Sequence, residues 1–89
     1  MTKKQERVIE YLKVKISQKE EEYRKDCPEF YKLYETSYSL EDKLSDLGGE
    51  IVSQAFEYAG YCMDLVHSVC VGNYTGYRSV NNIIKLMEN

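Results

Sequence analysis

The sequence predicts an all-α fold: a long helical hairpin with a kinked first arm and a long second helix, closed by a short C-terminal helix. Apolar residues recur at intervals of three and four along most of the chain, which is the spacing of one helix face. Most positions between them hold residues that favour helices. The chain has one proline and five glycines, and its 89 residues leave room for a single helical domain, residues 1–89.

The first arm is predicted to begin with a helix over about residues 4–24. Its apolar face consists of Ile9, Leu12, Ile16 and Tyr23. A break or kink is expected at residues 26–28, because Pro28 is tolerated in the first turn of a helix but not in its interior. Asp26, with Glu29 three positions later, has the spacing of a capping box that starts a new helix.

The second piece of this arm is expected to end near Glu35. Its inward residues are predicted to be Phe30, Leu33 and Tyr34. The apolar phase of Ile16 and Tyr23 continues through these positions, so the two pieces of the arm are expected to be nearly collinear.

A long second helix is predicted over about residues 40–71. Ser39, with Asp42 three positions later, has the spacing of a helix N-cap. The apolar stripe then advances in steps of three or four through Leu40, Leu44, Leu47, Ile51, Ala55, Tyr58, Cys62, Leu65 and Val69. Gly48 and Gly49 interrupt this stripe, but it keeps its phase across them, which favours a continuous or mildly kinked helix.

The segment 51–71 is apolar nearly all the way round, and such a helix is normally buried on every side. Charge supports this interpretation, because residues 1–45 hold 20 charged residues and residues 46–89 hold seven. A domain this small buries only about 60% of its unfolded surface by itself. We therefore expect a homodimer whose interface residues are Val52, Phe56, Ala59, Met63 and Val66.

The last helix is expected over about residues 79–87. Its inward residues are predicted to be Val80, Ile83, Ile84 and Met87. This helix also indicates an alternative function, because it is similar to the second helix of a helix-turn-helix DNA-binding regulator. The residues that would contact DNA are Arg78, Asn81, Asn82 and Lys85. The net charge of −3 counts against this alternative, since proteins that bind nucleic acid usually carry a basic surface.

No set of residues predicts catalysis, a metal or a cofactor. Asp64, His67 and Cys70 lie three apart, as a thiol enzyme would need, but no oxyanion donors are evident, so we expect no enzyme. A zinc site would need Cys27, Cys62, His67 and Cys70, but these residues lack the paired spacing of zinc ligands, and Cys62 lies about 12 Å from Cys70 along a helix. The three cysteines are expected to be buried, reduced thiols.

Tyrosine is abundant, with nine in the chain, and it is enriched in protein-binding surfaces. Three tyrosines at intervals of three and four form a stripe next to acidic residues. The predicted partner-binding surface consists of Tyr31, Tyr34, Tyr38, Glu35, Glu41 and Asp42. Aromatic anchors surrounded by charge are typical of binding hot spots.

We therefore predict a non-enzymatic protein–protein interaction module, such as a small inhibitor or adaptor, with a protein partner. The basic start, Met1–Arg7, is followed by no apolar segment, so we expect no signal peptide, a cytoplasmic location and no membrane contact. The richness in Lys, Glu, Tyr, Asn and Ile resembles the style of proteins from AT-rich bacteria and their phages. That resemblance implies a phage-type inhibitor of a host enzyme, for example an anti-defence protein.

Overall fold

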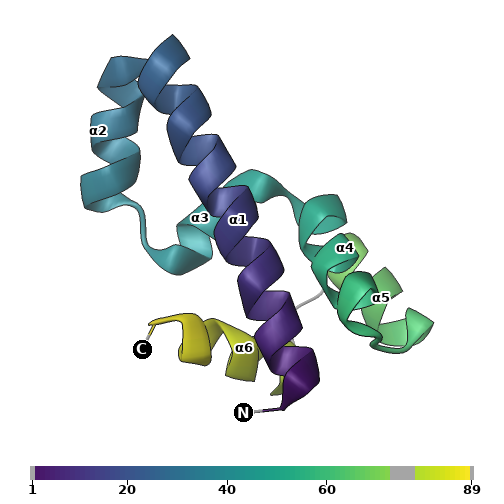
Figure 1. The fold of residues 1–89 in the computed structure, drawn as a ribbon. Helices are drawn as coiled ribbons and strands as arrows, with labels where there is room; N and C mark the ends of the chain where they lie inside the picture. The colour runs from purple at the N-terminus through teal and green to yellow at the C-terminus, as the bar shows by residue number, and fades with distance from the viewer. Residues whose placement is uncertain (1, 73–77, 89) are drawn as a thin grey trace.

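The computed structural model describes residues 2–72 and 78–88, and these residues form six helices and no strand. The helices are α1 (Lys3–Asp26), α2 (Pro28–Ser37), α3 (Leu40–Leu47), α4 (Gly49–Ala59), α5 (Met63–Cys70) and α6 (Arg78–Glu88). The all-α prediction is therefore confirmed. Figure 1 shows α1 running through the length of the molecule, with the other helices placed around it. The molecule measures 38 × 25 × 20 Å.

Helix α1 begins at Lys3, one residue before the predicted start, because Thr2 caps it. The Thr2 hydroxyl accepts a hydrogen bond from the Gln5 amide at 3.2 Å, and the Gln5 side chain accepts one from the Thr2 amide at 2.9 Å. This reciprocal pair is a capping box, and it satisfies two of the free donors at the helix start. The buried face of α1 consists of Val8, Ile9, Leu12 and Ile16.

The chain breaks between α1 and α2 at Cys27, as predicted, and Pro28 is the first residue of α2. The predicted capping box of Asp26 and Glu29 is wrong, because Asp26 is the last residue of α1 and the N-cap of α2 is Cys27, which makes no side-chain cap bond.

The expectation of two collinear pieces is wrong. Helix α2 folds back beside α1, so that the ring of Tyr34 lies 5.3 Å from that of Tyr23 (Figure 1). Leu33, expected to face inward, is 48% exposed. Because α2 reverses direction, the face of α2 that contacts α1 differs from the face that was expected for a straight continuation of the arm.

The predicted long helix over residues 40–71 is wrong, because the structure divides it into α3, α4 and α5. The first division is at Gly48, which has φ 91° and ψ 153°. This backbone conformation is essentially restricted to glycine. The apolar stripe keeps its phase across Gly48, but the helix axis does not continue through it.

The second division follows Ala59, where Gly60 adopts the left-handed conformation with φ 92° and ψ 20°. The Tyr61 amide donates to the Phe56 carbonyl at 3.1 Å, and the Gly60 amide donates to the Glu57 carbonyl at 3.0 Å. These two bonds form a Schellman motif, which ends a helix by satisfying its last carbonyls. The ring of Tyr61 packs edge-on against that of Phe56 at 5.2 Å, which supplies the apolar contact that usually accompanies this motif.

Helices α4 and α5 pack against each other as an antiparallel pair (Figure 1). At Gly49, the first residue of α4, an added Cβ would lie 2.5 Å from the Cys70 backbone oxygen at the end of α5. Helix α4 also packs on α1. This arrangement explains the apolar character of α4, since α1 covers one of its faces and α5 covers another, whereas Tyr58, Met63 and Val71 stay exposed.

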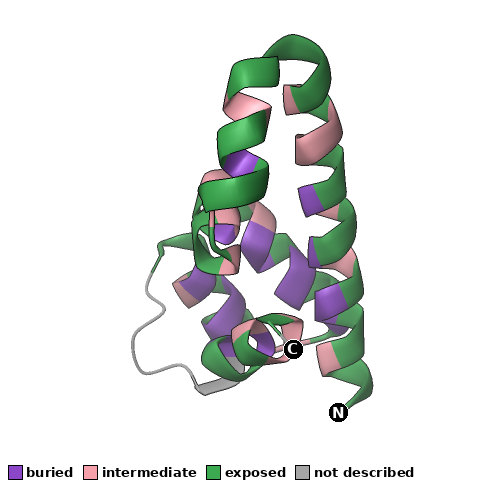
Figure 2. Ribbon diagram, turned by 90° about the vertical axis from the view of Figure 1, so that its left-hand side faces the viewer, coloured by how far each residue is buried: buried purple, intermediate pink, exposed green. Residues whose placement is uncertain are grey.

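Helix α6 packs against α1 and α3 and closes the core, as the sequence predicted for a short C-terminal helix. Val80 and Ile83 are 2% and 1% exposed, and Ile84 and Met87 are partly buried against the same cluster. Figure 2 shows that the buried residues gather in the body of the molecule, whereas the end of the arm formed by α1 and α2 is mostly exposed. Among the described residues, no helix combines the length and apolar character needed to span a membrane.

Candidate protein-binding surface

The predicted tyrosine stripe on α2 lies largely on the inside of the arm. The rings of Tyr23, Phe30, Tyr34 and Tyr38 pack edge-to-face or tilted against one another, with centroid distances between 4.7 and 6.3 Å. Tyr34 is fully buried, so its assignment to a partner-binding surface is wrong. Tyr31 and Tyr38 are half-buried and Glu35 is exposed. The packed rings hold α2 against α1 and leave α2 little free aromatic surface.

Two phenol groups of this aromatic cluster have different environments. The Tyr23 hydroxyl donates a hydrogen bond to the Asp46 carboxylate at 2.8 Å, whereas the buried Tyr34 hydroxyl has no hydrogen-bond partner among the described residues. Burial, reinforced by Asp46, raises the pKa of both phenols to about 12. The ordinary pKa of a tyrosine is 10.0, so both phenols hold their protons more tightly in the folded chain than in the unfolded chain. This difference stabilises the fold below about pH 10, and the stabilisation is lost as the pH rises toward 12.

Replacing Tyr34 by phenylalanine should raise the free energy of unfolding by about 1 kcal/mol, because a buried hydroxyl without a partner carries an uncompensated desolvation penalty. Urea unfolding at neutral pH, followed by circular dichroism, measures this change. The matched control is Tyr23→Phe, which removes the bond to Asp46 and should lower stability by about 1–2 kcal/mol. Equal losses in the two variants would show that the Tyr34 hydroxyl is hydrogen-bonded after all.

The predicted dimer interface does not lie on the surface. Four of its residues are at most 6% exposed within the single chain: Val52, Phe56, Ala59 and Val66. Met63, the fifth, is 64% exposed. The expectation of a dimer through these five side chains is therefore wrong, because α1 and α5 already cover the apolar faces of α4.

Of the other exposed apolar side chains, Val14 on α1 and Tyr58 on α4 line one shallow hollow together with Tyr11. Leu33 on α2 and Val71 after α5 lie on other parts of the chain. Tyr58 has an aromatic neighbour in Tyr11, at a centroid distance of 5.5 Å. Single exposed apolar residues are normal on soluble proteins and do not by themselves mark a binding site.

The outer face of α3 carries a group of acidic and polar residues. Glu41, Asp42, Ser45 and Asp46 lie together on this side of α3, because residues three and four apart are neighbours on a helix surface. Asp42 also caps α3, since its carboxylate accepts the Ser39 amide at 3.1 Å. We call these four residues the α3 surface.

The one lysine of α3 is turned away from the α3 surface. The Lys43 side chain is 19% exposed, and its ammonium lies 3.5 Å from the Glu20 carboxylate and 5.1 Å from the centre of the Tyr34 ring. Glu41 and Asp42 make no ion pair within the described residues. Lys43 pairs with Glu20 and contacts Tyr34, so it does not neutralise the carboxylates of the α3 surface. The α3 surface is therefore a patch of negative charge.

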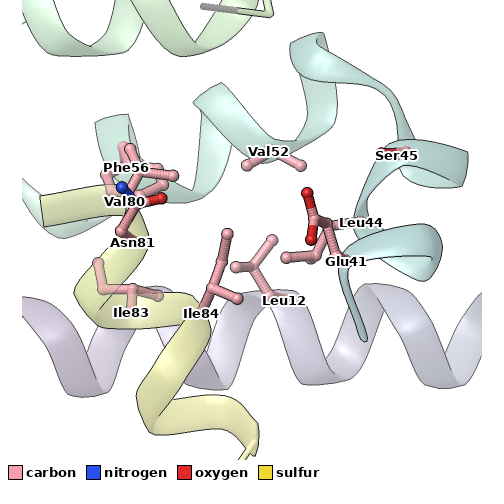
Figure 3. A pocket seen from close by; sticks show the side chains of 10 residues that line it. All are labelled: Leu12, Glu41, Leu44, Ser45, Val52, Phe56, Val80, Asn81, Ile83 and Ile84. Carbon is pink, nitrogen blue, oxygen red and sulfur yellow. The ribbon is translucent and has the colours of Figure 1, made fainter. Parts of the chain in front are cut away.

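Two depressions flank the α3 surface, and Ser45 lines both. A shallow hollow lies where the end of α2 meets α3, and Tyr38, Asp42 and Asp46 contribute to it. On the other side is a cavity of about 90 Å³ between α1, α3, α4 and α6. Its walls are formed by Leu12, Leu44, Val52, Phe56, Val80, Ile83 and Ile84, with Glu41, Ser45 and Asn81 as its polar residues (Figure 3).

Of the six residues predicted to bind a partner, Glu41 and Asp42 lie on the α3 surface, and Tyr38 lines the hollow beside it. Tyr31 and Glu35 lie on α2, and Tyr34 is inside the arm. Sequence reasoning missed Ser45 and the cavity beside it. The helical spacing of Ser45 from Glu41 could have placed the two on one face, but no sequence signal indicates that α6 packs beside α3.

The residues of the alternative DNA-binding surface lie on α6, and Asn81, Asn82 and Lys85 are exposed. Arg78 begins α6, but its side chain lies outside the described part of the structure. Glu41 lines the same cavity as Asn81, so a carboxylate stands beside this face. A carboxylate repels phosphate, so this placement does not favour DNA binding.

The three cysteines are exposed, so the expectation of buried thiols is wrong. Cys62 and Cys70 lie at the two ends of α5, and Cys27 lies at the corner between α1 and α2. Asp64 and His67 are also exposed on α5. In residues 2–72 and 78–88, no group of three His, Cys, Asp or Glu side chains is arranged to hold a metal ion.

The comparisons with known proteins find no matching family model, no matching curated protein and no matching solved structure.

Proposed function

We propose that this chain is a non-enzymatic protein-binding module, acting as a small inhibitor or adaptor, whose partner contacts the α3 surface with a basic segment. The observation that carries the proposal is the position of Ser45, which joins an acidic hollow to an apolar cavity. An apolar pocket surrounded by charge is the usual form of a binding hot spot. The negative charge of Glu41 and Asp42 selects a basic partner and accelerates its approach.

The homodimer is not part of this proposal, because the side chains that were expected to form it are used inside the chain. The α3 surface is also unsuited to pairing with a second copy of itself. Two copies meeting there would place carboxylates against carboxylates, and like charges brought together across an interface disfavour association. The partner is therefore a different protein.

Site-specific photocrosslinking in a lysate of the producing cells tests this function. The crosslinking residue p-benzoylphenylalanine replaces Ser45 on the α3 surface, or Ser17, which is exposed on the outer side of α1. We expect a crosslinked product of one discrete mass from position 45 and none from position 17. Raising the salt concentration of the lysate before irradiation should reduce the yield, because exposed charges are screened.

The charge variant Glu41→Lys, combined with the crosslinker at position 45, separates a specific partner from random capture. Glu41 is exposed and makes no described ion pair, but it lies in the first turn of α3, so the reversal should lower the free energy of unfolding by about 0.5–1 kcal/mol and leave the chain folded. The crosslinked product should fall by about tenfold or more, which corresponds to ~1.4 kcal/mol of binding free energy. Equal yields from positions 45 and 17, or a yield that Glu41→Lys does not change, would exclude the α3 surface as the contact.

A further inference from the structure

The cavity beside the α3 surface is assembled from parts of the chain that are far apart in sequence. Leu12 comes from α1, Leu44 from α3, Val52 from α4 and Ile84 from α6. Figure 3 shows these four side chains pointing toward a common space. The cavity is therefore a property of the folded chain, and it opens beside exposed residues of α3 and α6.

The volume of the cavity limits what can enter it. An apolar cavity of about 150 Å³ holds benzene, which has six carbon atoms. In proportion, the cavity of about 90 Å³ holds about four carbon atoms, which matches the side chain of leucine or isoleucine. A phenyl or indole ring is too large. The walls supply no buried polar partner, so the group that enters is aliphatic.

The polar residues around the cavity indicate what adjoins this aliphatic group. Glu41 is exposed, lines the cavity and makes no ion pair within the described residues. Asn81 and Ser45 add exposed hydrogen-bonding groups. A ligand that fills the cavity therefore places its neighbouring groups next to a carboxylate, and a cationic neighbour complements that charge.

We propose that the cavity receives one leucine or isoleucine side chain from a partner protein, and that an arginine or lysine next to it in the partner's chain pairs with Glu41. This inference rests on the proposed function and specifies the chemistry of the partner. The aliphatic side chain anchors the partner in the cavity, and the pairing of the basic residue with Glu41 orients the partner. The expected recognition motif is short: one branched aliphatic residue with a basic neighbour.

A second copy of this chain is a poorer occupant than a separate partner. The exposed leucine that a second copy could insert is Leu33 on the arm, next to Lys32. Glu29 and Glu35 lie on the same short helix and are exposed. They would be brought up to the carboxylates of the α3 surface, and this repulsion disfavours the contact.

Titration of the ¹⁵N-labelled chain with short capped peptides tests the inference. The probes are Gly-Arg-X-Arg-Gly with leucine, alanine or tryptophan as X, and Gly-Glu-Leu-Glu-Gly. We expect the Arg-Leu-Arg peptide to shift the amide signals of Leu12, Val52 and Ile84, and to bind at least about tenfold more tightly than the other three peptides. Equal binding of the alanine peptide would overturn the anchor, and no binding of the Arg-Leu-Arg peptide would overturn the whole inference.

Three variants test the contacts. Val52→Leu fills the cavity from within and Asn81→Leu covers its mouth from an exposed position on α6, so the second remains informative if the first destabilises the fold. Each should reduce binding of the Arg-Leu-Arg peptide by at least about tenfold. Glu41→Gln should weaken binding and remove most of its salt dependence, whereas the control Glu57→Gln, on exposed α4 surface, should change neither. Unchanged binding in both cavity variants would refute the inference.

The failure of this inference can be told apart from the failure of the proposed function. If Glu41→Lys abolishes crosslinking from position 45 but both cavity variants leave it intact, the α3 surface binds a partner without using the cavity, and the inference is wrong. If 3-methylbutylamine alone binds as tightly as the Arg-Leu-Arg peptide, the cavity is a small-molecule site and the inference is also wrong. Self-association in sedimentation velocity that Leu33→Asp removes would identify a second copy as the occupant and overturn it.

Discussion

Replacing Phe56 by alanine should lower the free energy of unfolding by about 3–5 kcal/mol, the usual loss for a large aromatic side chain in a core. The Phe56 ring is 1% exposed and packs against Tyr61, and it also forms part of the wall of the 90 Å³ cavity. Removing it joins a new void to the existing cavity, and the surrounding helices cannot close both without moving. Thermal unfolding followed by circular dichroism should show a midpoint at least about 12 °C lower.

The matched control for this experiment is Met63→Ala. Both residues were assigned to the same dimer interface from the sequence, but Met63 is 64% exposed and Phe56 is buried inside the chain. We expect Met63→Ala to change stability by no more than about 0.5 kcal/mol. The unfolding midpoint of the unmodified chain should also be independent of protein concentration. A midpoint that rises with concentration, together with similar losses at both positions, would restore the interface that the structure contradicts.

The second large effect is expected at Gly49, where alanine should lower the free energy of unfolding by about 3 kcal/mol or more. A Cβ at this position would lie 2.5 Å from the Cys70 oxygen and 2.9 Å from the Val69 oxygen. Both are backbone atoms at the end of α5, so no side-chain rotation relieves the clash. The variant must push α5 away from α4, which loosens the packing of both helices. Denaturant unfolding measures the loss.

Gly72→Ala is the control for Gly49→Ala. Gly72 has φ 78°, and a Cβ there would meet nothing within 4 Å. Its replacement should therefore add only the strain of a left-handed alanine, about 1 kcal/mol. If Gly49→Ala were no more damaging than Gly72→Ala, then α4 and α5 would not be in the close contact that the structure shows.

Several features of this fold follow from local sequence. The capping pair of Ser39 and Asp42 and the break before Pro28 were predicted correctly, because each depends on residues within one turn of helix. The inward residues of α6, Val80 and Ile83, also follow from the helical period alone. The composition of the α3 surface was partly predictable, since Glu41 and Asp42 are adjacent in the chain and are exposed.

The sequence by itself determined the helical character of this chain, the buried face of α1 and the acidic character of α3, because these properties depend on residues one helical turn apart. Only the tertiary structure decided that Gly48 and Gly60 end helices, that α2 reverses and buries Tyr34, and that α6 closes a cavity beside Ser45. An apolar stripe has the same period whether its helix continues or folds back on itself. Whether the helix continues or folds back depends on which other helix covers the apolar stripe. The pairing of two helices that are far apart in the chain leaves no periodic signal in the sequence.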